Sequence, residues 1–174
     1  MDTLFLAFLW THIAAGTMAL LAGPIAMVAR KGGQNHRRGG RLFFWAMMWI
    51  AISAVALSLM RSGTFLLLVG VFSFYLTFTG YRIIYRKTPA QRAGAIDWIA
   101  AILALAGSLG LVVWAQTQAA RGIALVSLTF AGIGAIFAIT DMARFIRPPS
   151  DPNAWWFVHM TRMLASYIAT VTAF

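Results

Sequence analysis

The residues best suited to chemistry are three histidines and a few charged side chains that lie inside long apolar segments. Four polar residues recur at steps of three and four in the last segment, residues 154–174: His159, Arg162, Ser166 and Thr170. A helix turns once every 3.6 residues, so these four form one stripe. Ionised groups are costly in hydrocarbon and seek a partner or a water-filled cavity. We therefore expect the stripe to face the interior of a helical bundle.

Depth in the membrane predicts which histidines meet. His159 lies about 7 Å inside one end of its segment, at 1.5 Å per residue, and His36 lies in the loop at that same end. The depth of His12 is counted from the opposite face of the membrane. In a core about 30 Å thick, the depths of His12 and His159 therefore differ by roughly 10 Å. His36 and His159 are therefore the better-matched pair. For His12 we favour a neutral histidine that is hydrogen-bonded across helices, with a haem ligand or quinone contact as the alternative.

Asp141 is one of only four acidic residues and lies near the same end as His159. The short loop between the fifth and sixth segments predicts that they are neighbours, so Asp141 can meet Arg162 or His159. One interpretation is a buried Asp141–Arg162 ion pair that fixes helix register. The other is a polar pocket in which His36, His159 and Asp141 hold a metal ion such as Zn, Fe or Mn.

A redox cofactor is an alternative to a metal ion in such a pocket. In that interpretation haem b or a quinone contacts the histidines, and Arg162 pairs with an anionic group such as a propionate. The predicted cofactor-binding residues are then His12, His36, His159 and Arg162. The HxxxH, HExxH, GxGxxG, Walker and nucleophile-elbow patterns are absent, so we assign no catalytic residue.

These residues must be positioned by membrane helices. The chain has 174 residues, of which 61% are hydrophobic and 10% charged, whereas soluble domains carry roughly a quarter charged residues. Six apolar segments are expected, at residues 3–29, 42–60, 64–84, 97–116, 122–145 and 154–174. The runs are continuous rather than alternating, which predicts an all-α polytopic transmembrane bundle instead of a β-barrel. We expect one domain, residues 1–174.

Charge and cysteine content exclude several classes of protein. The net charge is +10, but the basic residues lie in loops between segments, which indicates membrane topology rather than nucleic-acid binding. The absence of Cys excludes disulfides, thiolate metal sites, iron–sulfur clusters and haem attached through CxxCH.

The distribution of the basic residues predicts an orientation. The loops after the first, third and fifth segments hold Arg30, Lys31, Arg37, Arg38, Arg41, Arg86, Lys87, Arg92 and Arg147, against Arg61 and Arg121 on the other face. The positive-inside rule makes the first group cytoplasmic and both termini external. The basic loop expected at residues 30–41 is also suited to anionic lipid head groups.

Several strings of the sequence resemble a family of bacterial proteins. They are HIAAG, KGGQNHRRGGR, FSFYLTFTGYR, DMAR and HMTRMLASYIATVTAF. Together they are similar to a family of uncharacterised multi-pass inner-membrane proteins, defined by a domain of unknown function. The resemblance implies a bacterial inner-membrane protein of six or more helices, and it implies no activity.

The function that we predict is a small inner-membrane protein whose His/Asp/Arg pocket opens to the cytoplasm and binds a metal ion or a redox cofactor. One alternative is a non-catalytic accessory subunit, in a homo-oligomer or a larger membrane complex, where the ionisable residues serve packing. A second is a small transporter, although no pair of Gly/Pro-broken repeats supports it. Whether the protein is an enzyme is left open.

Overall fold

The computed structural model describes residues 3–61 and 63–173, which form six α-helices, one short 3-10 helix and no strand. The elements are α1 (Thr3–Val28), α2 (Gln34–Arg61), α3 (Thr64–Arg82), η1 (Ile83–Tyr85), α4 (Ala95–Gln116), α5 (Arg121–Ile146) and α6 (Ala154–Ala173). Five of them, α1 to α5 with η1 continuing α3, are long and apolar enough to cross a membrane. The sixth, α6, has 20 residues and carries the polar stripe, which lowers its hydropathy. The predicted all-α membrane fold is confirmed, with five of the six expected spans long and apolar enough to cross a membrane.

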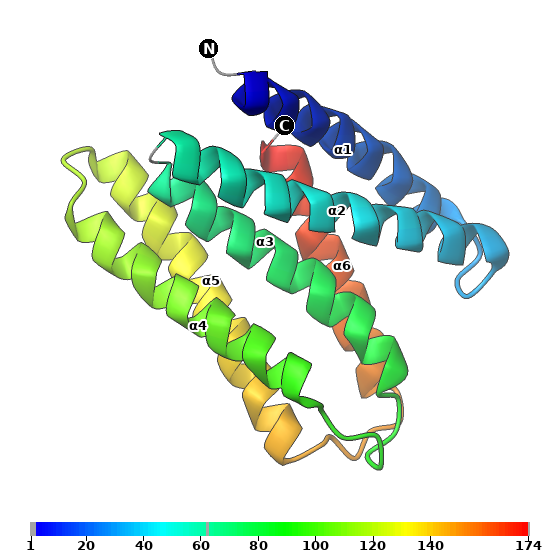
Figure 1. Ribbon diagram of the computed structural model, residues 1–174. Coiled ribbons are helices and arrows are strands. Elements are labelled where there is room, and N and C mark those ends of the chain that lie inside the picture. Colours follow the sequence, from blue (N-terminus) through cyan, green and yellow to red (C-terminus); the bar gives the residue numbers. More distant parts are fainter. Residues whose placement is uncertain (1–2, 62, 174) are drawn as a thin grey trace.

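Helices α3 and α6 form the middle of the bundle, between the hairpin α1–α2 and the hairpin α4–α5 (Figure 1). Helix α3 packs against α2, α4, α5 and α6, so it is the central element. Within the described part of the chain, no Cα atoms of α5 and α6 lie within 8 Å of each other. The expectation that these two helices pack as direct neighbours is therefore wrong, because α6 packs against α3 instead. The long side chain of Arg162 on α6 reaches α5.

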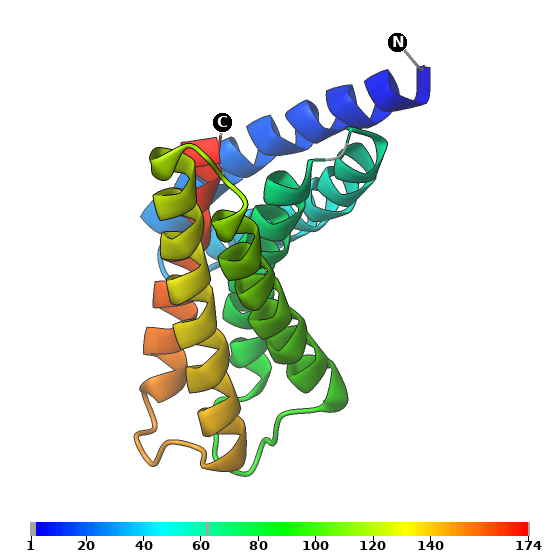
Figure 2. The ribbon, with the colours of Figure 1, turned by 90° about the vertical axis from the view of Figure 1, so that its left-hand side faces the viewer.

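The connections between helices lie at two ends of the bundle. The connections α1–α2, α3–α4 and α5–α6 lie toward the lower right of Figure 1, and the two other turns lie toward the upper left. The first three carry most of the loop arginines and lysines, and we call this the basic end. Helix α1 begins and α6 ends at the opposite end, as an even number of helices requires. Figure 2 shows α1 at the edge of the bundle, where it lies along α2.

The prediction that residues 30–41 form a loop is wrong after Gly33, because α2 already begins at Gln34. The turn needs only a few residues, since Gly32 adopts a φ of 75° that favours glycine. The start of α2 then packs closely on α1. Gly39 is buried there, and a Cβ at this position would lie 3.1 Å from the backbone nitrogen of Ala26. Three predicted loop arginines, Arg37, Arg38 and Arg41, therefore lie on the first turns of a helix.

Small residues let the central helices approach each other. A Cβ on Gly80 of α3 would lie 3.0 Å from Cβ of Arg162 on α6. A Cβ on Gly23 of α1 would meet the ring of Tyr167 on α6. Such contacts are typical of membrane bundles, in which close backbone packing replaces the hydrophobic drive of soluble proteins. They bring the polar stripe of α6 against α1 and α3.

Candidate functional site

The stripe on α6 faces the interior of the bundle, as its spacing predicts. Three of its four residues are buried, with Arg162 only 2% exposed and Ser166 completely covered. The hydroxyl groups of Ser166 and Thr77 on α3 are hydrogen-bonded to each other. Thr170 donates to the carbonyl of Ser166 at 2.9 Å. These bonds satisfy polar groups that would otherwise be costly in hydrocarbon.

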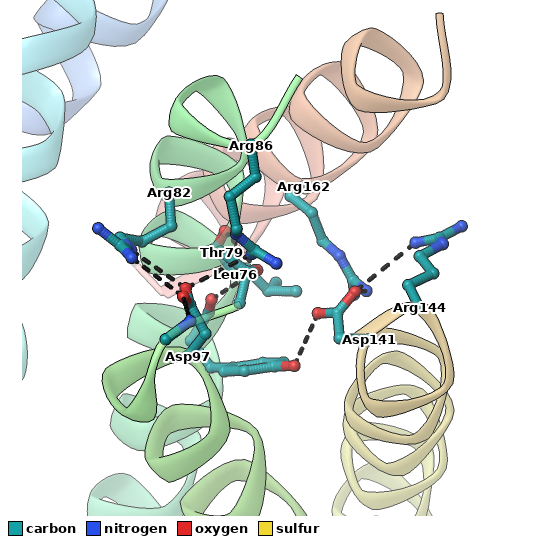
Figure 3. Close-up of polar contacts among 10 residues, drawn as sticks. Leu76, Thr79, Arg82, Arg86, Asp97, Asp141, Arg144 and Arg162 are labelled. Carbon is teal, nitrogen blue, oxygen red and sulfur yellow. Dashed lines mark hydrogen bonds and ion pairs between the residues drawn. The ribbon is translucent and has the colours of Figure 1, made fainter. Parts of the chain in front are cut away.

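Asp141 of α5 is at the centre of a buried ionic cluster (Figure 3). Arg162 Nη2 lies 2.8 Å from Asp141 Oδ1 and also donates to the carbonyl of Phe137 at 3.2 Å. Tyr75 of α3 donates its hydroxyl to Asp141 Oδ2 at 2.7 Å. Arg144, one turn along α5, lies 3.6 Å from Asp141 Oδ1. The predicted Asp141–Arg162 pair is confirmed, and it connects α5 and α6, whose backbones do not touch.

The environment of Arg162 explains how a guanidinium persists at this depth. Its Cζ lies 3.7 Å from the centre of the Phe137 ring, a cation–π contact. Its Nη1 is buried and has no hydrogen-bond partner among the described residues. Both Asp141 oxygens accept hydrogen bonds, so the carboxylate fixes the positions of Arg162 on α6 and Tyr75 on α3 relative to α5. This geometry agrees with the structural interpretation of the pair, while a contact of Arg162 with a cofactor stays a prediction.

A second carboxylate cluster, at Asp97, was not predicted as a site. Asp97 lies on the first turn of α4 and is 2% exposed. Arg82 at the end of α3 binds it in a bidentate manner, with Nε and Nη2 each 3.0 Å from a carboxylate oxygen. Arg86 Nη2 lies 3.4 Å from Asp97 Oδ1, and the backbone of Gly94 donates to Oδ2 at 2.9 Å. The carboxylate therefore caps α4 and anchors the end of α3.

His36 and His159 are brought together, as the depth argument predicts. Their ring centres lie 6.1 Å apart, with the planes at 71°. His36 Nδ1 is 2.8 Å from the carbonyl of Ala26 on α1, and His159 Nδ1 is 2.7 Å from the carbonyl of Gly80 on α3. A carbonyl can only accept, so each Nδ1 carries the proton and the neutral ring has its lone pair on Nε2. Both rings are thus oriented by the backbone of a different helix.

Two glycine contacts make this orientation possible. Gly39 lets the start of α2 approach Ala26 of α1, whose carbonyl binds His36. Gly80 lets α3 approach α6 and itself presents the carbonyl that binds His159. Larger side chains at either position would separate the helices and lengthen these bonds.

His12 does not join the other two histidines. Its Nδ1 lies 2.8 Å from Oγ of Ser53 on α2, and that hydroxyl donates to the carbonyl of Trp49 at 2.7 Å. Because the Ser53 hydroxyl donates its proton to that carbonyl, it accepts the hydrogen bond from His12 Nδ1. The interpretation of His12 as a histidine hydrogen-bonded across helices is confirmed, and a role as haem ligand or quinone contact is untested.

Asp141 is not assembled with the two histidines into a metal site. Among the described residues, no group of three or more His, Cys, Asp or Glu side chains has an arrangement that would hold a metal ion. Both oxygens of Asp141 instead accept hydrogen bonds from Arg162 and Tyr75. Metal binding by His36 and His159 alone stays a prediction.

Two pockets lie at the basic end, and His36 and His159 line neither of them. The smaller has a volume of about 20 Å³ and lies between Arg86 and Asp141, bounded by Thr79 and Val158. The larger has a volume of about 60 Å³ and lies between the α3–α4 and α5–α6 connections. They share Arg86, Arg144 and Phe145, so they are adjacent.

A comparison with protein families places the chain. Residues 9–140 match the family described as "Predicted membrane protein (DUF2306)", which is more than half of the sequence. The chain belongs to this family. The DUF2306 match covers most of α1, all of α2 to α4 and most of α5, and therefore includes His12 and His36, while Asp141, His159 and Arg162 lie beyond it. Comparisons with curated proteins and with solved structures give no match.

The family confirms the resemblance seen in the sequence and adds no activity. It describes a membrane protein, which agrees with the helices of this DUF2306 chain. Sequence reasoning missed Tyr75 and Asp97. The sequence did contain a signal for Asp97. This acidic residue lies at the start of an apolar segment, and only a short loop separates it from the basic cluster that ends the preceding segment. No sequence signal distinguishes Tyr75 from the other aromatic residues of α3.

Proposed function

We propose that this membrane protein binds a redox-active metal centre between His36 and His159, with haem iron as the preferred occupant. The observation that carries this proposal is the hydrogen bond of each Nδ1 to a backbone carbonyl. Metal-ligating histidines in proteins almost always donate their other ring N–H in this way. The bond fixes the tautomer and turns Nε2 into a ligand.

The separation of the rings supports the same interpretation. A metal–nitrogen bond is about 2.0–2.1 Å, so a metal ion held by both Nε2 atoms would need the two rings to be near neighbours. The observed separation is 6.1 Å. In the described residues no Cα atoms of α2 and α6 lie within 8 Å of each other, so side chains alone connect these two helices. Cofactors in helical bundles are commonly held by side chains from such facing helices.

The number of ligands favours haem over a free ion. Protein sites for zinc use three or four side chains, whereas haem iron needs only axial ligands because the porphyrin supplies the others. Two histidines without a third donor therefore match the requirement of haem iron. The proposal has two other forms. In one, a free metal ion completes its coordination with water, and in the other, a quinone is hydrogen-bonded to Nε2.

The charge distribution supports an orientation for the proposed bacterial inner-membrane protein. By the positive-inside rule the basic end would face the cytoplasm, with both termini external. The histidine pair then lies near the cytoplasmic face of the inner membrane. An electron donor or acceptor would reach it from that side.

One observation favours the accessory-subunit alternative. Helix α1 is the least buried of the five apolar spans, and it lies at the edge of the bundle against α2 (Figure 2). A membrane partner or a second copy would cover that surface. This alternative needs no cofactor, which makes the two proposals separable in one experiment.

The test is an absorption spectrum with elemental analysis of the full chain, purified in mild detergent after expression with added haem precursor. We expect a Soret band with stoichiometric iron that is lost in His36→Ala and in His159→Ala. The matched control is His12→Ala, which removes a histidine that is bonded to Ser53 and lies apart from the pair. Stoichiometric metal without a Soret band would identify the free-ion form.

Two results would contradict the proposal. One is a chain that folds, carries neither metal nor chromophore, and binds none on reconstitution with haemin or with divalent metals. The other is a bound centre that survives both substitutions in the pair. A stable co-purifying partner on a cofactor-free chain would support the accessory-subunit alternative instead.

A further inference from the structure

The larger pocket at the basic end has the composition of an anion-binding site. Its volume of about 60 Å³ exceeds the roughly 15 Å³ that one water needs, so it accommodates a tetrahedral oxyanion. The charged side chains that line it are Arg86, Lys87, Arg92, Arg144 and Asp151, and the aromatic ones are Phe145 and Trp155. Four of the five charged side chains are positive and one is negative.

The two carboxylate clusters do not neutralise this charge. Arg86 shares Asp97 with Arg82, which holds both oxygens of that carboxylate. Arg144 shares Oδ1 of Asp141 with the buried Arg162. Each carboxylate therefore serves two guanidinium groups. The excess positive charge faces the pocket, where partial burial makes an unneutralised charge costly.

One donor of Arg86, a residue that lines the site, is left without a partner. Nε of Arg86 is buried and makes no hydrogen bond among the described residues. An arginine presents its N–H groups in a planar fork that suits phosphate oxygens. Arg86 lies where the two pockets meet, with Cζ 4.9 Å from the centre of the Phe145 ring, so its guanidinium is fixed in place.

The walls of the pocket are ordered before any ligand binds. The side-chain oxygen of Gln91 accepts hydrogen bonds from the backbone of Lys87 at 2.8 Å and Thr88 at 3.1 Å, which closes the α3–α4 connection. The Lys87 ammonium lies 4.5 Å from the centre of the Trp155 ring at the start of α6. A preorganised site loses less entropy on binding.

We propose that this pocket binds a phosphate group, held by Arg86, Lys87, Arg92 and Arg144. The group belongs either to the head of an anionic membrane lipid or to a free phosphate-bearing solute, because the pocket lies at the end of the membrane helices. The site is separate from His36 and His159 and does not depend on the proposed metal centre.

The experiment measures ligand binding to the full chain in two arms. In the first, inorganic phosphate is titrated into protein in a zwitterionic detergent. In the second, the protein is delipidated and phosphatidylglycerol is titrated against phosphatidylcholine. Saturable binding of inorganic phosphate identifies a solute site, and saturable binding of phosphatidylglycerol alone identifies a lipid site.

The variant that tests the pocket is Lys87→Gln/Arg92→Gln, since neither residue makes an ion pair in the described part of the chain. A basic residue near an anionic head group contributes about fivefold in affinity, so we expect binding of the ligand to weaken about 25-fold. The matched control is Arg37→Gln/Arg38→Gln, which removes the same charge at the same end but outside the pocket. It should change affinity less than about twofold.

Either of two results would overturn the proposal. One is an equal loss of affinity in the pocket variant and in the control, which would reveal only general attraction to positive charge. The other is the absence of saturable binding in both arms. The helical content of each variant is also measured. A value equal to that of the wild type shows that a difference in affinity does not arise from unfolding.

Discussion

The clusters at Asp141 and Asp97 use the same chemistry in two different environments. Each is a buried carboxylate that serves two arginines and one further donor. At Asp141 the main partner, Arg162, is 2% exposed, and at Asp97 the main partner, Arg82, has a side chain that is 30% exposed. The difference lies in whether the cation can reach water when its partner is lost.

This comparison shows what each cluster does for the fold. The Asp141 pair connects two helices whose backbones are not in contact, so it is a tertiary restraint. The Asp97 cluster joins elements that are adjacent in sequence, because it caps α4 and holds the end of α3. Long-range and local ion pairs of similar geometry should therefore differ in their contribution to stability.

The largest expected effect is that of Asp141→Asn. It leaves the Arg162 guanidinium buried without a counter-charge, which costs about 3–5 kcal/mol of unfolding free energy. The measurement is reversible unfolding in mixed micelles with a denaturing detergent. Adding Arg162→Met should recover part of the loss, and a loss below about 1 kcal/mol in the single variant would show that Arg162 reaches water.

Asp97→Asn should be less damaging. The exposed Arg82 can turn toward solvent, and the new amide oxygen can still accept from the backbone of Gly94. We expect a loss of about 1–2 kcal/mol, in the range of a helix cap together with a half-exposed ion pair. If Asp97→Asn proved more destabilising than Asp141→Asn under the same conditions, the comparison drawn above would be reversed.

Tyr75→Phe removes one hydrogen bond from the Asp141 cluster and leaves the ion pair intact. Hydrogen bonds between membrane helices contribute about 0.6 kcal/mol on average and at most about 1.7 kcal/mol. We expect a loss of about 1 kcal/mol by the same unfolding measurement. Combined with Asp141→Asn, the substitution should add little, because the two residues share that bond.

Arg144→Gln should have the smallest effect on stability. The Arg144 side chain is 43% exposed and its nitrogen lies 3.6 Å from Oδ1 of the buried Asp141, so solvent screens most of this interaction. A change of at most about 0.5 kcal/mol is expected. A larger loss would mean that Arg144 neutralises Asp141 as strongly as Arg162 does.

Several features of the site follow from spacing alone. The inward stripe of α6 and the pairing of Asp141 with Arg162 are predictable, because a helix has a fixed period and an isolated charge in a membrane needs a partner. The proximity of His36 and His159 follows from their depth. The contacts of Tyr75 and Asp97 were not predicted, since they depend on how α3 is rotated against α4 and α5.

The sequence by itself determined that this is an all-helical membrane protein, which ionisable residues turn inward, and at which end they gather. Hydrophobic length and helical period are local properties, and they suffice for those conclusions. Only the tertiary structure decided that α6 packs on α3 rather than on α5, that α2 begins at Gln34, and that Asp141 is separate from the histidines. Those outcomes depend on which surfaces of two helices fit together at small residues such as Gly39 and Gly80, and that fit involves residues far apart in the chain.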